Sequence, residues 1–125
     1  MKICISSTGK DLDAFVDQRF GRCRYFLIFD TETMNVKTIS NESTLSSGGA
    51  GIQAAQSVIK EEIGSVITGN IGPNAFQILQ AAGVKVYTAT DVTIKDAIDN
   101  YKKGKLKETI SANVESHSGI GGRNL

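Results

Sequence analysis

The pattern of apolar and polar positions predicts three strands in the first third of the chain. Residues 2–7 and 25–30 are rich in strand-forming side chains. Residues 34–39 alternate apolar and polar positions after the turn-like stretch 30–33. The second and third of these strands are therefore predicted to form a β-hairpin.

The pattern changes after residue 50, where helical spacing alternates with short apolar strands. The spacing predicts helices over 51–62, 74–82 and 93–103, and strands over 65–68 and 84–87. Gly83 is expected to end the second of these helices, and Asp91 or Thr93 to cap the third.

The resulting order, βββαβαβα, predicts a single α/β domain with a mixed five-stranded sheet flanked by helices. Residues 63–90 contain one charge, Lys85, which is typical of strands buried on both faces. From Ser111 onward the periodicity is lost and glycine and serine dominate. We therefore expect a domain over residues 1–110 and a flexible Gly/Ser-rich tail over 111–125.

Composition excludes several classes of protein. The chain has 125 residues, 14 Lys and Arg against 13 Asp and Glu, and thus a net charge of +1, which provides no global field for a polyanion. No apolar run approaches the roughly 20 residues of a membrane span. We expect a cytoplasmic protein that binds neither nucleic acid nor membrane, with its two cysteines as free thiols.

The most unusual segment places three of the four arginines around a cysteine. Arg19, Arg22 and Arg24 fall within six residues and surround Cys23. Guanidinium groups favour a nearby thiolate and match oxyanions or the sulfides of an anionic cluster, so Cys23 is a candidate soft ligand or nucleophile. In the alternative interpretation Cys23 only begins a strand, and the arginines pair with the carboxylates of Asp13, Asp17 and Asp30.

The other cysteine and the single histidine give weaker signals. Cys4 lies on the opposite strand face to Ile3 and Ile5 and is predicted to be a small buried or half-buried thiol. His117 falls in the predicted tail, where solvation is the simpler expectation, although the imidazole could complete a metal site.

Two glycine-rich turns precede predicted helices. Gly49-x-Gly51-x-x-Ala54 matches a dinucleotide fingerprint in form, but it follows a hairpin instead of the first strand of a βαβ unit. In the second turn, Gly72-Pro73-Asn74, the proline stands where a first helical residue belongs. The following free N–H groups make an anion site at the positive end of the helix.

Both turns are expected at one edge of the sheet, where α/β proteins usually bind ligands. The simpler alternative for each turn is that glycine allows a tight turn and close helix packing. No Walker lysine, H-E-x-x-H or G-x-S-x-G motif is present, and one tail histidine leaves hydrolytic catalysis disfavoured.

With these motifs in view, the chain resembles the dinitrogenase iron-molybdenum cofactor biosynthesis family, which contains NifX-like proteins and the C-terminal domain of NifB-like proteins. The resemblance runs from about Lys2 to Tyr101. Three motifs carry it, namely Asp17-x-Arg19-Phe20-Gly21-Arg22-Cys23-x-Tyr25-Phe26, Gly49-Ala50-Gly51-Ile52-Gln53-Ala54-Ala55 and Thr68-Gly69-x-x-Gly72-Pro73-Asn74-Ala75-Phe76.

The resemblance implies a ribonuclease H-like fold and a non-enzymatic role as a nitrogenase accessory protein. The implied cargo is an iron-sulfur cluster or an iron-molybdenum cofactor precursor, bound transiently, carried or stored during metallocluster assembly. The implied partner is a metallocluster-assembly or client metalloprotein, and the chain is expected as a monomer or weak homodimer. The predicted cofactor-binding residues are Arg19, Gly21, Arg22, Cys23, Arg24, Gly49, Gly51, Gly72, Pro73 and Asn74, with Cys23 and His117 as metal ligands.

Two other functions use the same residues. A small thiol enzyme would use a low-pKa Cys23 on an oxyanion substrate. A regulator would bind a phosphate-bearing ligand at the glycine turns and would not need Cys23.

Overall fold

A computed structural model describes residues 1–42 and 49–112 of the chain. The elements in chain order are β1 (Lys2–Ser7), β2 (Tyr25–Asp30), β3 (Val36–Ser40), α1 (Ala50–Ile59), β4 (Ser65–Thr68), α2 (Pro73–Ala81), β5 (Lys85–Thr88), α3 (Ile94–Lys102) and β6 (Lys107–Thr109). The order begins with βββαβαβα, as predicted, and the predicted tail lies outside these residues from position 113 onward.

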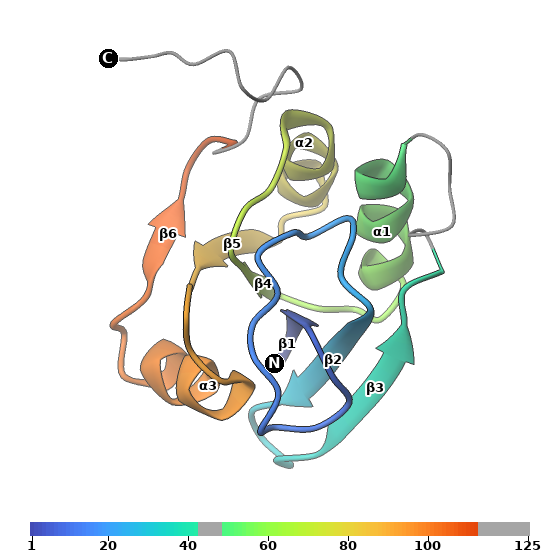
Figure 1. Cartoon of the computed structure of the whole chain (residues 1–125). Helices are drawn as coiled ribbons and strands as arrows, with labels where there is room; N and C mark the ends of the chain where they lie inside the picture. The colour runs from blue at the N-terminus through green and yellow to red at the C-terminus, as the bar shows by residue number, and fades with distance from the viewer. Residues whose placement is uncertain (43–48, 113–125) are drawn as a thin grey trace.

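The strands form one mixed sheet in the order β3-β2-β1-β4-β5-β6 (Figure 1). β1 pairs antiparallel with β2 and parallel with β4, so the hairpin half and the βα half meet at β1. The α/β class and the mixed sheet are confirmed. The ribonuclease H-like label stays a prediction.

The predicted number of five strands is wrong, because β6 adds a sixth. It pairs antiparallel with β5, with Val86 opposite Thr109. Its three residues, Lys107–Thr109, are mostly exposed and show no apolar alternation. Backbone pairing at the sheet edge therefore makes this strand, and the side-chain pattern carries no signal for it.

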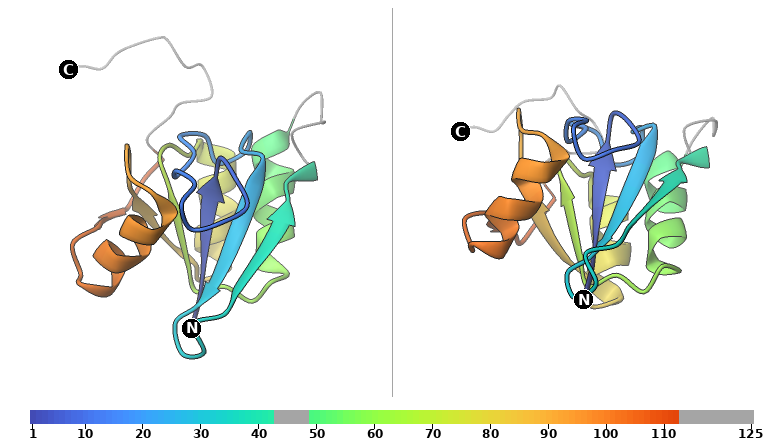
Figure 2. Two further views of the ribbon diagram at one scale, coloured as in Figure 1. Left: turned by 60° about the horizontal axis from the view of Figure 1, so that its bottom comes forward. Right: turned by 90° about the horizontal axis from the view of Figure 1, so that it is seen from below.

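The helices cover both faces of the sheet, with α1 and α2 on one face and α3 on the other (Figure 2). Side chains alternate along each strand, which explains the two separate cores. Cys4 and Val66 pack with the α1 and α2 side, as predicted for Cys4, whereas Ile3 and Ile5 pack with the α3 side. No helix within the described residues is long and apolar enough to cross a membrane.

Three helix boundaries follow the expected local signals, whereas α1 ends at Ile59 and not at the predicted residue 62. Thr93 caps α3, because its side chain accepts a hydrogen bond from the Asp96 N–H at 3.1 Å. Pro73 is the first residue of α2, as predicted. Gly83 follows the end of α2 with a φ of 79°, a left-handed conformation that glycine adopts without strain.

Candidate functional site

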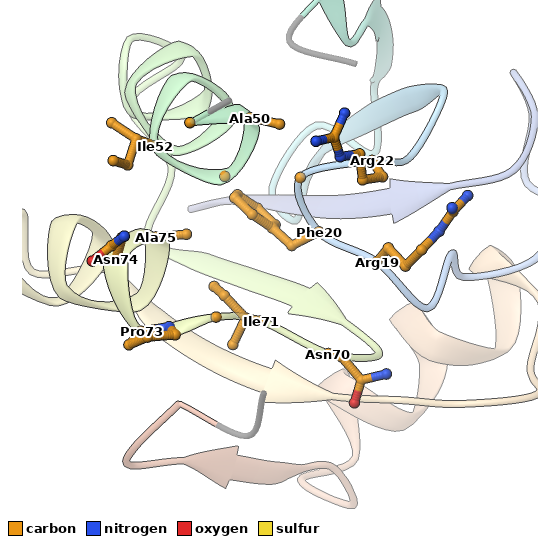
Figure 3. A pocket seen from close by; sticks show the side chains of 14 residues that line it. Arg19, Phe20, Arg22, Ala50, Ile52, Asn70, Ile71, Pro73, Asn74 and Ala75 are labelled. Carbon is orange, nitrogen blue, oxygen red and sulfur yellow. The ribbon is translucent and has the colours of Figure 1, made fainter. Parts of the chain in front are cut away.

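A pocket of about 410 Å³ lies between the starts of α1 and α2 (Figure 3). The loop before β2 forms another wall. Its lining residues are Arg19, Phe20, Gly21, Arg22, Gly49, Ala50, Gly51, Ile52, Asn70, Ile71, Gly72, Pro73, Asn74 and Ala75. The three motifs of the sequence thus meet in one place, and both glycine turns lie at one edge of the sheet, as expected.

Backbone hydrogen bonds hold the arginine-bearing loop against the loop between β4 and α2. The Phe20 N–H donates to the Asn70 carbonyl at 3.1 Å, and the Gly69 N–H donates to the Asp17 carbonyl at 3.3 Å. The Asp17 carboxylate accepts the Arg19 N–H at 2.9 Å. Arg19 is therefore placed by its backbone, while its side chain remains 66% exposed.

Gly21 allows the same loop to touch α1. A Cβ at this position would lie 2.9 Å from both the Cα and the N of Gly51, and 3.2 Å from the carbonyl carbon of Ala50. Real Cβ atoms essentially never approach another heavy atom that closely. Only glycine lets the loop and the first turn of α1 form adjacent walls of the pocket.

Two helix N-termini face the pocket without side-chain caps. Gly49 precedes α1 and Gly72 precedes α2, and neither helix has a side-chain capping bond. The first intrahelical bonds are donated by Gln53 to Gly49 and by Phe76 to Gly72. The N–H groups before these donors have no acceptor within their own helix, so two positive helix ends border one cavity.

The charged side chains that line the pocket add to the positive charge of the two helix ends. Arg19 and Arg22 come from the loop on one side of the pocket (Figure 3), and none of the lining residues that the structure describes is acidic. Phe20 and Ile71 are almost completely buried and form an apolar floor with Ala75. The pocket therefore suits an anion that is also weakly hydrated.

Cys23 does not line this pocket. It is fully buried, its Sγ–H donates to the Phe20 carbonyl at 3.4 Å, and the Sγ accepts from the Asn41 side-chain amide at 3.7 Å. Burial, followed by the charge of Asp17, raises the pKa of Cys23 to about 12, although hydrogen bonds from Ser7 and Asn41 oppose the shift. The prediction of a favoured thiolate is therefore wrong.

Arg24, another predicted residue, does not line the pocket among the described residues. The Arg24 guanidinium lies over the ring of Tyr25, 5.7 Å from its centroid. His117 lies outside the described residues. Of the alternative ion pairs, Arg19 with Asp17 occurs at 3.7 Å.

Asn41 was missed by the sequence reasoning. Its side-chain amide donates to the Gly21 carbonyl at 3.2 Å and to the Cys23 carbonyl at 2.9 Å. These are the residues directly before and after Arg22 in the chain. The backbone N–H of Asn41 donates to the Arg24 carbonyl at 3.0 Å. An asparagine directly after a strand gives no local signal that it fastens a loop 18 to 20 residues earlier.

The described residues contain no group of three or more His, Cys, Asp and Glu side chains that could hold a metal ion. A closed protein-ligated metal centre is therefore not built from residues 1–42 and 49–112.

The fold and site define a small α/β domain with an anion-type pocket at one sheet edge. The chain matches the family described as dinitrogenase iron-molybdenum cofactor over residues 1–104, and it belongs to this family. The resemblance inferred from the three motifs is thereby confirmed.

Three relatives support the assignment. The apo form of the orange protein from Desulfovibrio gigas is 38% identical, with a TM-score of 0.87 over 90% of this chain and 95% of that one. A Thermotoga protein provisionally described as a NifB protein of the DUF35 family is 39% identical, with a TM-score of 0.78 over 90% and 97%. An uncharacterized protein of Methanocaldococcus jannaschii is 30% identical over 92 residues, which cover 71% of this chain and 78% of the relative.

Proposed function

We propose that the pocket binds an anionic metallocluster as cargo, either an iron-sulfur cluster or an iron-molybdenum cofactor precursor. The observation that carries the proposal is that two uncapped helix starts and two arginines border one cavity, with no acidic side chain among the described residues that line it. The cluster is held through its outer sulfides by Arg19, Arg22 and the backbone N–H groups of α1 and α2. Family membership supports this class of cargo.

The proposed mode of binding departs from the predicted Cys23 ligand. A thiol with a pKa of about 12 has a negligible thiolate fraction near neutral pH, and the side chain is fully buried. The apolar floor formed by Phe20 and Ile71 favours sulfide, which is more weakly hydrated and more polarisable than a hard oxyanion. Binding without a metal–protein bond leaves the cargo exchangeable, which suits carriage to a client metalloprotein.

The same features argue against the thiol enzyme. Nucleophilic catalysis needs an activated thiolate within reach of its substrate. Cys23 is raised in pKa and covered, and Cys4 is buried with its pKa also raised by burial. We therefore propose a binding protein and not a catalyst.

Anaerobic reconstitution with iron and sulfide tests the proposal, with bound metal measured per folded protein. The double variant Arg19→Ala/Arg22→Ala should lose most of the bound metal. Arg24→Ala is the matched control, because it removes a neighbouring arginine outside the pocket. Cys23→Ser should retain metal at the wild-type level.

Two outcomes would contradict the proposal. Equal metal in wild type and Arg19→Ala/Arg22→Ala would remove the pocket from cluster binding. Loss of metal in a folded Cys23→Ser protein would restore Cys23 as a ligand.

A second candidate, binding of a phosphate-bearing ligand, is favoured by the two helix starts alone. Thermal-shift measurements with inorganic phosphate and nucleotides separate the two functions. Stabilisation by these ligands, without metal uptake on reconstitution, would make the phosphate regulator the better assignment.

A further inference from the structure

Two exposed cations converge on one tyrosine ring beside the pocket loop. The Lys10 Nζ and the Arg24 Cζ each lie 5.7 Å from the centroid of Tyr25, so the two charges are no further apart than twice this distance. We refer to Lys10, Arg24 and Tyr25 as the Lys10–Arg24 patch. Such stacking holds the cationic groups over the aromatic ring.

Hydrogen bonds hold the backbone of both cationic residues of the patch. The Thr38 hydroxyl of β3 donates to the Lys10 carbonyl at 2.9 Å, and the Asn41 N–H donates to the Arg24 carbonyl at 3.0 Å. Arg24 follows the pocket residue Arg22 by two positions, which limits their Cα separation to about 7 Å. The patch therefore lies next to the pocket, on backbone that hydrogen bonds hold in place.

The patch lacks an acidic partner within the described part of the chain. Lys37 and Lys103 form ion pairs with Glu61 and Asp99, whereas no such pair includes Lys10 or Arg24 among residues 1–42 and 49–112. Carboxylates from another molecule would pair with these two cations. Arginine and tyrosine are also enriched in protein interfaces.

We infer that the Lys10–Arg24 patch docks a short acidic segment of a partner protein. Asp11 and Asp13 are exposed in the same loop as Lys10 and add negative charge close to it in the chain. This charge disfavours a long polyanion such as nucleic acid, which needs many cations in a row, whereas two cations suit a few carboxylates. The inference goes beyond the cargo, because it holds whichever anion occupies the pocket.

A fluorescein-labelled hexaglutamate peptide provides the probe, with binding followed by anisotropy and by amide chemical shifts. Wild type should bind with shifts at Lys10, Arg24 and Tyr25, and affinity should fall as ionic strength rises from about 0.05 to 0.2 M. Lys10→Glu/Arg24→Glu should weaken binding at least about tenfold. Lys10→Gln/Arg24→Gln repeats the test without introduced negative charge.

The matched control is Lys60→Glu/Lys105→Glu, which makes the same change in net charge at two exposed lysines that follow the C-terminal ends of α1 and α3. It should bind within about twofold of wild type. Equal weakening in both double variants would reduce the effect to net charge and overturn the docking surface.

Two further binding measurements identify what binds to the patch. Arg22→Ala should bind the peptide as wild type does, and loss in this variant would mean that the glutamates enter the pocket, which also contradicts the patch. Octathymidylate binding as tightly as hexaglutamate, with the same dependence on Lys10 and Arg24, would replace the acidic protein segment by nucleic acid. A result that contradicts peptide docking at the patch leaves metal binding at the pocket untouched, so the two proposals are distinguishable.

Discussion

The contact between Gly21 and Gly51 gives the sharpest test of how the pocket is built. Replacing Gly21 with alanine places a Cβ 2.9 Å from two backbone atoms of Gly51. Backbone in the first turn of a helix cannot rotate away as a side-chain end can, so the loop and α1 have to separate. Overpacking of this kind costs about 1–3 kcal/mol.

Gly51→Ala is the matched control, since it adds the same methyl group to the other partner of the contact. Its Cβ would lie 3.4 Å from the Ala75 Cβ, an ordinary van der Waals distance. Alanine in a helix is also more favourable than glycine, by about 0.5–1 kcal/mol in an interior position. We expect Gly21→Ala to be destabilised and Gly51→Ala to be unchanged or slightly stabilised.

Thermal unfolding followed by circular dichroism measures the difference. For a chain of this size the cost at Gly21 corresponds to a lower Tm by roughly 3–15 °C. The same variant should bind less metal per folded protein, because Arg22 moves away from α1. Melting of Gly21→Ala at the wild-type temperature, or an equal loss in both variants, would refute the close-approach argument.

Three other predictions rest on single side chains. Asn41→Ala removes the donor shared by the carbonyls of Gly21 and Cys23, and should cost about 1–3 kcal/mol in urea unfolding; an unchanged midpoint would contradict the role of Asn41 as a loop fastener. Burial raises the pKa of Cys23 to about 12 in the folded state, whereas the unfolded thiol ionises near pH 9, so its contribution to the free energy of unfolding is complete below pH 9 and is lost at up to about 1.4 kcal/mol per pH unit from 9 to 12. Cys23→Ala should flatten this decline in stability with pH, and a decline parallel to that of wild type would show that burial does not raise the pKa. Thr93→Ala removes the α3 cap and should lower stability by about 0.5–2 kcal/mol by the same unfolding assay, whereas Thr93→Ser should retain most of it.

The elements and the place of the pocket were accessible from sequence because they depend on local signals. Apolar spacing identifies five strands and three helices, and Pro73 marks the start of α2 within one residue. Helices that follow strands of the same direction begin at the same edge of the sheet, so both glycine turns could be expected at that edge. β6 could not be predicted in this way, because it forms by pairing with the edge strand β5 and has no apolar pattern of its own.

The properties of Cys23 could not be predicted in the same way. Charge in the neighbouring sequence positions predicts a stabilised thiolate, but the decisive quantity is the depth of the sulfur atom. The long side chains of Arg22 and Arg24 reach the surface from the same loop that directs the short Cys23 side chain into the core. Asn41 adds a distant hydrogen-bond partner that no local pattern connects to this loop.

Because the Cys23 thiol is buried and the guanidinium groups of Arg19 and Arg22 are exposed, substitutions at these residues should have different effects on cargo affinity and on stability. The donors at the starts of α1 and α2 belong to the backbone and persist in any variant that folds. Arg19 and Arg22 are exposed, whereas Cys23 is buried in the core and Asn41 fastens the loop. Substitutions at the arginines should therefore act mainly on cargo affinity. Asn41→Ala should lower both affinity and stability, and Cys23→Ser should change stability but leave the metal bound per folded protein at the wild-type level.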